Sequence, residues 1–473
     1  MPPITPPPVP PPPAAAPLPR SQKPGHGFGG FISGFTLNAP NYLANPIYNL
    51  ALGLNPVLIG VVIALSRFWD GVTDPLFGYL SDNARSRWGR RKPFMLLGAI
   101  MLGVTFALMW WIPRGATDEF YFWWFLGTTL LFYTASSTFL SPWSALGIEM
   151  TKDYHERTVL NSYVGFCYKA VGMSYAWLFP LAQLAVFQDT LEGVRYVGLA
   201  CGTLLTLFAL VPVFAVREKE LATAAAKHKP LPFIASMRAV CSSPTFLKVS
   251  AVSVLTMTSL MTVSSLALYI NIYHVYGGNK LAAAKTAAYF GMWFNLLSIL
   301  SIPLVTWLGR RLGKHRAIML CLGAISVSAV CKFFAYTPAA PWAQFLIPLL
   351  HAPGLAAYII LLNSMTADLV DDDEYRTGQR REALLAAANH WLTKMGMSLS
   401  YIAAGLILAG TGFDAAKTIQ DPETVLRMRL WFCGVPAVGT LLALILLRGY
   451  PLTKARLEEI QQTLRERRAS NTP

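Results

Sequence analysis

The stretch VVIALSRFWDGVTDPLFGYL, residues 61–80, is mostly apolar and yet carries three ionisable side chains. About 20 apolar residues in a helix cross the hydrocarbon core of a bilayer. In such a helix Arg67, Asp70 and Asp74 stand at positions i, i+3 and i+7, which share one face. An ionisable group at mid-bilayer costs roughly 2.5–3.5 kcal/mol or more, so these three residues predict a functional site inside a membrane.

The whole chain has the composition of a membrane protein. Of its 473 residues, 54% are hydrophobic and only 13% are charged, and the mean hydropathy is +0.43. A soluble protein of this length needs more charge on its surface, so soluble classes are excluded. We expect an all-α membrane protein with twelve transmembrane helices, at roughly residues 28–51, 55–80, 93–113, 120–147, 160–187, 195–215, 246–274, 284–308, 316–336, 342–367, 385–410 and 429–448.

A long polar stretch divides these helices into six and six. We expect an N-terminal six-helix bundle at 26–216, a central cytoplasmic loop at 217–245 and a C-terminal six-helix bundle at 246–450. Residues 1–25 are Pro-rich and are expected to be a disordered tail, and residues 451–473 form a basic tail. The six cysteines are scattered without CxxC spacing, which predicts neither a disulfide framework nor a metal centre.

Lys and Arg gather in alternate loops. GYLSDNARSRWGRRKP (78–93) and GRRLGKHR (309–316) each follow the second helix of a bundle. Because positive loops stay in the cytoplasm, the pattern predicts that both termini are cytoplasmic. The basic residues that give the net charge of +15 therefore orient the protein in the membrane and do not indicate nucleic acid binding. The repeated Gly-Arg-Arg order also favours two parallel repeats, as in alternating-access transporters with a solute site between the halves. The alternative is that both loops only orient the helices.

Asp70 and Asp74 are the strongest candidates for a cation site. Two carboxylates one helical turn apart repel each other unless a cation lies between them or one takes a proton. A site made of oxygen ligands favours Na⁺ or H⁺. The alternative is a structural Arg–Asp cluster that joins helices.

Other polar residues inside apolar segments are candidates for solute binding. Lys169 and Lys394 lie too deep to reach the membrane surface easily, so each is expected to face the bundle interior, and His390 precedes Lys394 by one turn. Asn residues recur every three or four positions in the first segment, which suits either sugar hydroxyls or hydrogen bonds between helices. They are Asn38, Asn41, Asn45 and Asn49. For His351 and Asn295, packing is the favoured interpretation.

The motif RFWDGVTDPLFGYLSDNARSRWGRRKPF (67–94) closely resembles the second helix and following loop of the glycoside-pentoside-hexuronide:cation symporters, a group of the major facilitator superfamily. PWSALGIEMTKDYHERT (142–158) and ADLVDDDEYRTGQRRE (367–382) resemble further motifs of that family. The resemblance implies the major facilitator fold and cation-coupled solute uptake across a cytoplasmic membrane. It implies a cation site at Asp70 and Asp74 with Thr73 beside it, and a functional role for Lys394.

The same resemblance implies a gate that closes the cytoplasmic side. The residues that match it are charged and lie in or near loops: Asp82, Arg85, Arg90, Arg91, Glu149, Asp153, Glu156 and Arg157. We also assign Arg67, Arg310 and Arg311 to the gate, the last two because they occupy the corresponding loop of the second repeat.

The resemblance does not extend to the residues with which the family's melibiose carrier binds its galactoside. No acid occurs between Gly27 and Leu54, and Asn38 is the nearest polar candidate. We therefore expect a symporter of a sugar, glycoside or uronide other than melibiose. Alternatives are an amphiphilic or aromatic organic acid or lipid-like solute, and a non-transporting membrane receptor or scaffold. An enzyme is disfavoured because neither HExxH nor GxSxG occurs. We expect no cofactor beyond the coupling ion, and a monomer in the bilayer.

Overall fold

The computed structural model describes residues 19, 21–151, 154–216, 243–378, 382–448, 450, 452 and 454–470. These residues form helices and connecting turns, without a strand. The N-terminal half (residues 21–216) comprises α1 (Gln22–Ala44), the π-helical turn η1 (Asn45–Asn49), α2 (Pro56–Asn83), α3 (Lys92–Trp110), α4 (Asp118–Met150), α5 (Tyr154–Ser174), η2 (Tyr175–Trp177), α6 (Leu178–Ala182) and α7 (Thr190–Ala215).

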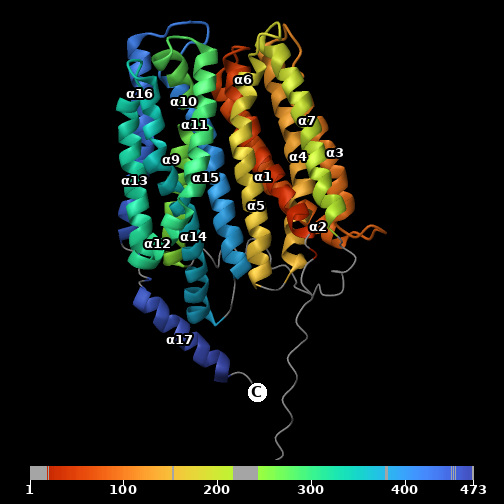
Figure 1. The fold of residues 1–473 in the computed structure, drawn as a ribbon, viewed down its shortest axis with the longest axis vertical. Helices are drawn as coiled ribbons and strands as arrows, with labels where there is room; N and C mark the ends of the chain where they lie inside the picture. Colours follow the sequence, from red (N-terminus) through yellow and green to blue (C-terminus); the bar gives the residue numbers. More distant parts are fainter. Residues whose placement is uncertain are drawn as a thin grey trace, which may run out of the picture.

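The C-terminal half begins at residue 243 and repeats this plan. It comprises α9 (Pro244–Thr262), α10 (Leu266–Ile270), η3 (Asn271–Val275), α11 (Lys280–Leu300), α12 (Ile302–Leu312), α13 (Lys314–Ala335), η4 (Pro341–Leu346), α14 (Pro348–Thr377), α15 (Glu382–Gly410), α16 (Pro422–Arg448) and α17 (Lys454–Ser470). Figure 1 shows the two halves side by side, with α17 lying across one end of the bundle. We call this end, where α7 finishes and α9 begins, the linker end, and the opposite end the far end.

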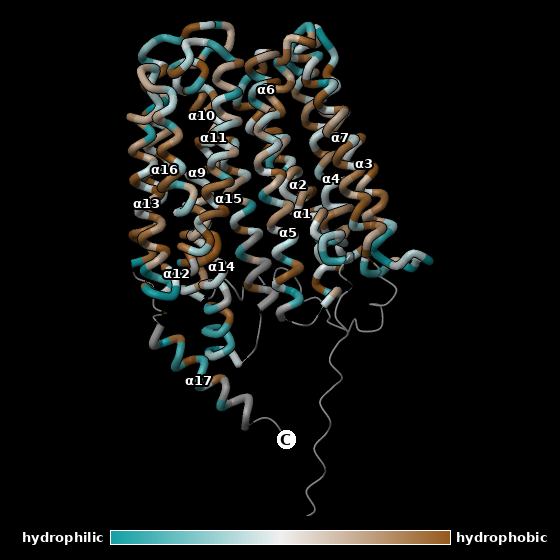
Figure 2. Tube along the Cα trace, viewed as in Figure 1, coloured by the Kyte–Doolittle hydropathy of each residue, from teal (hydrophilic) through white to brown (hydrophobic). Residues whose placement is uncertain are grey.

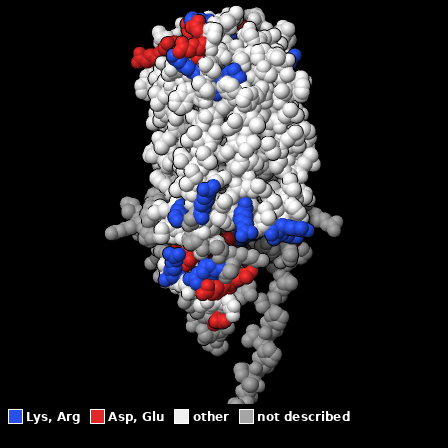
Figure 3. Space-filling model, turned by 90° about the vertical axis from the view of Figure 1, so that its left-hand side faces the viewer, with Lys and Arg blue, Asp and Glu red and all other residues white. Residues whose placement is uncertain are grey.

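Each of the twelve expected segments contains helix. Eight helices in the described part of the chain are long and apolar enough to cross a membrane, and a ninth span results if α11 and α12, bent by 44°, are taken together. The remaining expected segments correspond to α1, α4 and α5, whose Asn, Ser, Thr and Tyr residues lower their hydropathy. The tube view shows apolar residues along the outer helices (Figure 2). The space-filling view shows a belt without charged side chains between two charged ends (Figure 3).

Local sequence explains where the central helix α2 begins. Asn55 caps it by accepting a hydrogen bond from the Val57 amide at 2.8 Å, and Pro56 occupies the first turn, where its missing N–H costs nothing. The helix then runs for 28 residues to Asn83, through the whole charged stretch. Its polar face packs inward against α4 and α15, so the sequence motif lies between the two halves.

The two halves contact each other closely at the far end. A Cβ added at Gly60 of α2 would lie 2.4 Å from the Tyr401 carbonyl oxygen of α15, and one at Gly405 would lie 2.5 Å from that of Pro56. Only glycine permits this backbone approach. Tyr269 donates a hydrogen bond to the Asn49 side chain at 2.7 Å across the same contact.

The N-terminal tail is shorter than expected, and the basic C-terminal tail contains a helix. Helix α1 already begins at Gln22, and Gln22 and Gly25 are buried, so residues 22–25 belong to the bundle and not to a disordered tail. The basic C-terminal tail contains α17, which buries Ile460 and Leu464 and packs against α14. Gln461 donates to the Asp371 carboxylate at 2.9 Å in this contact. Leu457, Ile460 and Leu464, spaced three and four residues apart, were the signal for this amphipathic helix in the sequence.

Candidate functional site

A charged cluster joins α2 to α15 near the middle of both helices. The Lys394 ammonium donates to Asp70 Oδ2 at 3.0 Å and to Asp74 Oδ2 at 2.7 Å. Asp70 is buried, whereas the side chains of Asp74 and Lys394 are 35% and 37% exposed. The structure therefore brings together three predicted residues, with an ammonium group in the position between the carboxylates where a cation was expected.

Hydroxyl groups of α4 complete the oxygen environment. Ser137 donates to Asp70 Oδ1 at 3.3 Å and lies 2.8 Å from the Thr73 hydroxyl. Ser141 donates to the backbone carbonyl of Asp74 at 3.0 Å. Carboxylate, hydroxyl and carbonyl oxygens are the ligands that a hard cation prefers. Thr73 thus lies beside the carboxylates, as expected, and the two α4 serines are additional residues that sequence reasoning missed.

Arg67 lies one turn before Asp70 and is also buried. It donates to the Leu37 carbonyl of α1, and its guanidinium lies 4.7 Å from the centre of the Tyr133 ring. This position corrects our assignment of Arg67 to the gate. The helix carries it into the central cluster, away from the charged loop at the linker end, where it offsets the negative charge of the aspartates.

The asparagines of α1 and η1 have different roles. Asn41 donates to the Tyr401 hydroxyl of α15 at 3.2 Å and lies close to the charged cluster through that residue. Asn38 donates to the carbonyl of Gly34 at 2.9 Å, within its own helix. Asn49 joins the halves through Tyr269 and therefore serves as a helix contact. Asn45 lies in η1, half-buried.

Tyrosines surround this polar face of α1, and the sequence analysis did not select them. The rings of Tyr42 and Tyr175 lie 5.5 Å apart between their centres. Tyr401 follows Lys394 by seven residues, or two helical turns, so it shares the face that bears the lysine. That spacing was a signal available in the sequence. Asn41, Tyr401 and the tyrosine pair form a neutral, polar and aromatic wall next to the cluster.

Two other candidates stay outside this arrangement. Lys169 is half-buried on α5 and forms no ion pair with any described residue. The His390 side chain lies outside the described residues. His351 and Asn295 pack as expected: His351 bonds to the Ser328 hydroxyl at 2.8 Å, and Asn295 donates to the Gly172 carbonyl at 3.2 Å.

Several of the expected gate residues form ion pairs at the linker end. Arg91, whose side chain is 4% exposed, lies 2.8 Å from both Asp82 Oδ1 and Glu149 Oε2. Arg90 also bonds to Glu149. Glu156 pairs with Lys23 of α1 at 2.8 Å. The arrangement ties the α2–α3 loop to the end of α4, inside the N-terminal half.

The remaining gate candidates lie apart from this network. Arg85 and Arg157 are exposed, and Asp153 lies outside the described residues. Arg310 is exposed, and the Arg311 guanidinium lies 5.3 Å from the centre of the Trp307 ring. Neither arginine forms an ion pair with a described residue of the N-terminal half. A cytoplasmic gate between the halves therefore stays a prediction, and it applies to a conformation other than this one, whose halves meet at the far end.

The chain is similar to known transporters over most of its length. Residues 25–454 match the family model described as MFS/sugar transport protein. The glycoside/cation symporter YagG of Escherichia coli (strain K12), a provisional name, is 26% identical over 96% of both chains. The isoprimeverose transporter of Lactiplantibacillus pentosus is 22% identical over 86% of this chain and 83% of its own.

Two further proteins are similar to the chain over most of its length. The sodium-dependent lysophosphatidylcholine symporter 1 of Gallus gallus is 22% identical over 88% of this chain and 83% of its own. The crystal structure of a D-xylose-proton symporter superposes with a TM-score of 0.63, with 14% identity, over 89% of this chain and 96% of that one. This superposition identifies the fold of the chain as the major facilitator fold.

Proposed function

Since the chain belongs to the MFS/sugar transport protein family, we propose that it is a cation-coupled symporter of a sugar or glycoside. Family membership makes it a multi-pass membrane transporter and not an enzyme. The observation that carries the coupling proposal is the contact of one ammonium, that of Lys394, with both Asp70 and Asp74. Because the Lys394 ammonium already occupies the position between the two carboxylates, a free Na⁺ or H⁺ can take its place there.

The coupling follows from charge balance. While Lys394 and Arg67 together balance the charges of the two aspartates, the site does not need a further cation. When Na⁺ or H⁺ binds to the aspartates, the ammonium is released, and its hydrogen-bond donors become available on the α15 face that carries Tyr401. A bound cation therefore strengthens solute binding, and by linkage the solute tightens cation binding by the same factor.

The solute site in this proposal lies beside the cluster. Asn38 and Asn41 supply amide groups for sugar hydroxyls, and Tyr401 supplies a hydroxyl and an aromatic face. Lys169 and Lys394 add positive charge, which favours a solute with a carboxylate such as a uronide. A symporter of lipid-like solutes is a second candidate, because the lysophosphatidylcholine symporter is a relative and no acid occurs in α1.

We further propose the orientation and the transport cycle. The linker end, with its arginine-rich loops, is cytoplasmic, so both termini are cytoplasmic and the membrane is the cytoplasmic membrane. The contacts of α2 with α15 at the far end close the outer side in this conformation. Rocking of the halves opens that side, and Asp82, Arg85 and Arg91 then meet the loop with Arg310 and Arg311. We propose that a single chain completes this cycle as a monomer.

Uptake into proteoliposomes tests the proposal. With labelled glycosides, a uronide and a lysolipid offered in turn, the wild-type protein should accumulate one class against its gradient when a Na⁺ or H⁺ gradient is imposed. Asp74→Asn should lose accumulation and retain exchange of solute between the two sides, because Asp74 belongs to the proposed cation site and not to the proposed solute contacts. Asp118→Asn, at the far end of α4, is the matched control and should behave as wild type. Full accumulation by Asp74→Asn would refute the cation site.

A further inference from the structure

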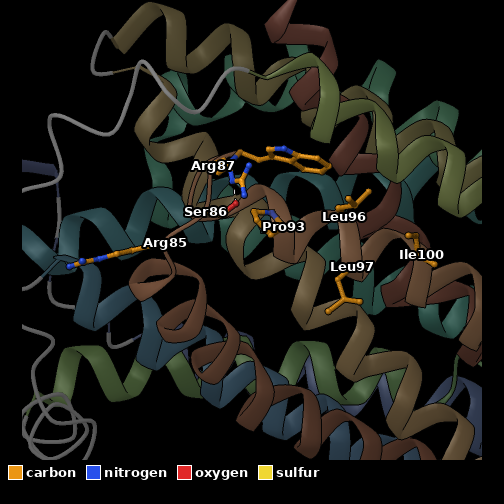
Figure 4. Close-up of a pocket in the computed structure, with 8 residues that line it drawn as sticks. Arg85, Ser86, Arg87, Pro93, Leu96, Leu97 and Ile100 are labelled. Atoms are coloured by element: carbon orange, nitrogen blue, oxygen red, sulfur yellow. Dashed lines mark hydrogen bonds between the residues drawn. The ribbon is translucent and has the colours of Figure 1, made fainter.

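A groove of about 650 Å³ opens on the surface at the linker end, apart from the central site. Its walls are the α2–α3 loop and the first turns of α3 (Figure 4). The lining residues are Arg85, Ser86, Arg87, Trp88, Pro93, Leu96, Leu97 and Ile100. One part of the groove is thus basic and the other apolar, so its occupant must present a negative charge next to hydrocarbon.

The arginines of this loop divide into two pairs. Arg90 and Arg91 bind the carboxylates of Glu149 and Asp82 and thus hold the loop to the bundle. Arg85 and Arg87 are exposed and form no ion pair with any described residue. A guanidinium offers five N–H donors in a planar fork that matches phosphate, and here both forks are free. Arg90 and Arg91 therefore hold the loop in place, and Arg85 and Arg87 are available to bind a ligand.

The apolar part of the groove continues along the outside of α3. Leu97, Ile100 and Val104 are 53%, 50% and 61% exposed, and they recur every three or four residues on one helical face. Because α3 is long and apolar enough to span a membrane, this face contacts lipid chains. Trp88 is 59% exposed at the basic end of the face. Exposed tryptophan at such a boundary is typical of the level of the lipid headgroups.

We propose that this groove is a binding site for an anionic phospholipid. Its phosphate lies at Arg87 beside Trp88, Arg85 adds a second positive charge on the same loop, and one acyl chain follows Leu97, Ile100 and Val104 along α3. A zwitterionic lipid places a cation against the same arginines and binds less well. A soluble phosphate reaches the arginines but leaves the apolar face uncovered. The occupant is therefore a lipid of the leaflet at the linker end.

The site is tested by lipid binding to the purified full-length chain, without any transport assay. Native mass spectrometry of the detergent-solubilised protein counts the bound lipids. We expect the protein to retain phosphatidylglycerol in preference to phosphatidylcholine. The double variant Arg85→Gln/Arg87→Gln should lose about 25-fold in phosphatidylglycerol affinity, since each basic residue near an anionic lipid surface contributes about fivefold. The double variant Arg85→Lys/Arg87→Lys should retain most of the affinity, because it keeps both charges.

The matched control is Arg310→Gln/Arg311→Gln, which removes the same charge from the corresponding loop of the other half. This variant should change the affinity by less than about twofold. An equal loss in both glutamine variants would overturn the proposal, because the effect would then come from overall charge. Equal retention of phosphatidylcholine would overturn it as well. Displacement of the lipid by glycerol phosphate at matched concentration would identify a soluble anion as the ligand and would refute a lipid site.

Discussion

The substitution Lys394→Met tests directly whether the ammonium and the coupling cation compete. Methionine retains much of the length of the side chain but removes its charge. In the structure the ammonium lies 3.0 Å from Asp70 Oδ2 and 2.7 Å from Asp74 Oδ2. In the variant the two carboxylates keep their mutual repulsion and lose this partner. A free cation should therefore bind more tightly than in the wild-type protein, although transport is expected to fail.

The magnitude follows from the burial of the cluster. Loss of one partner from a fully buried ion pair costs about 3–5 kcal/mol, whereas exposed pairs contribute about 1 kcal/mol or less. Asp70 is buried, but the Lys394 and Asp74 side chains are 37% and 35% exposed, so we take an intermediate cost of about 2 kcal/mol. At about 1.4 kcal/mol per tenfold, removal of the competing ammonium should raise cation affinity by about 30-fold.

The assay is isothermal titration of the purified protein with Na⁺ at several pH values, supported by cation-dependent thermal stabilisation. Lys169→Met is the matched control, since this lysine also lies in a central helix and forms no ion pair with a described residue. It should leave cation affinity within about twofold of wild type. If Lys394→Met binds Na⁺ and H⁺ no more tightly than wild type, the ammonium does not occupy the cation position, and the coupling argument fails.

Three further predictions concern the gate, the far end and the topology. Glu149→Gln should lower the free energy of unfolding by about 1–3 kcal/mol in chemical denaturation, because Glu149 accepts from the buried Arg91. Asp82→Asn removes an acid that is 52% exposed from the same arginine, so a loss in Glu149→Gln no greater than in Asp82→Asn would contradict this. Gly405→Val should push α2 and α15 apart, because its side chain would meet the backbone of Pro56, and it should increase thiol labelling of a cysteine at position 41 from the far end. Gly410→Val is the control and should not increase this labelling, because the space around Gly410 is open. Ser470→Cys, in a cysteine-free chain, should resist labelling from outside sealed cells, and efficient labelling would reverse the proposed orientation.

Local sequence predicts which residues form a helix and which of them share a face, whereas burial and depth depend on the packing of the helices. The tail expectation failed at Gln22 because a helix can begin inside a Gly- and Pro-containing segment when neighbouring helices bury it. The assignment of Arg67 to the gate failed for a related reason. The sequence motif predicted that Arg67 lies on α2 and which face of the helix it shares. The depth of Arg67 in the bundle, however, depends on how α2 packs against α1 and α4.

The central cluster shows the same division. The periodicity of residues 61–80 determined that Asp70 and Asp74 share one face of a membrane helix, because a helix repeats every 3.6 residues whatever surrounds it. The family motif added that this face serves a cation. Only the tertiary structure decided that Lys394, 324 residues after Asp70, bridges both carboxylates, and that Tyr401 meets Asn41. Such pairs depend on the crossing and the relative depth of packed helices, which are set by contacts along their whole length and not by the residues that form the pair.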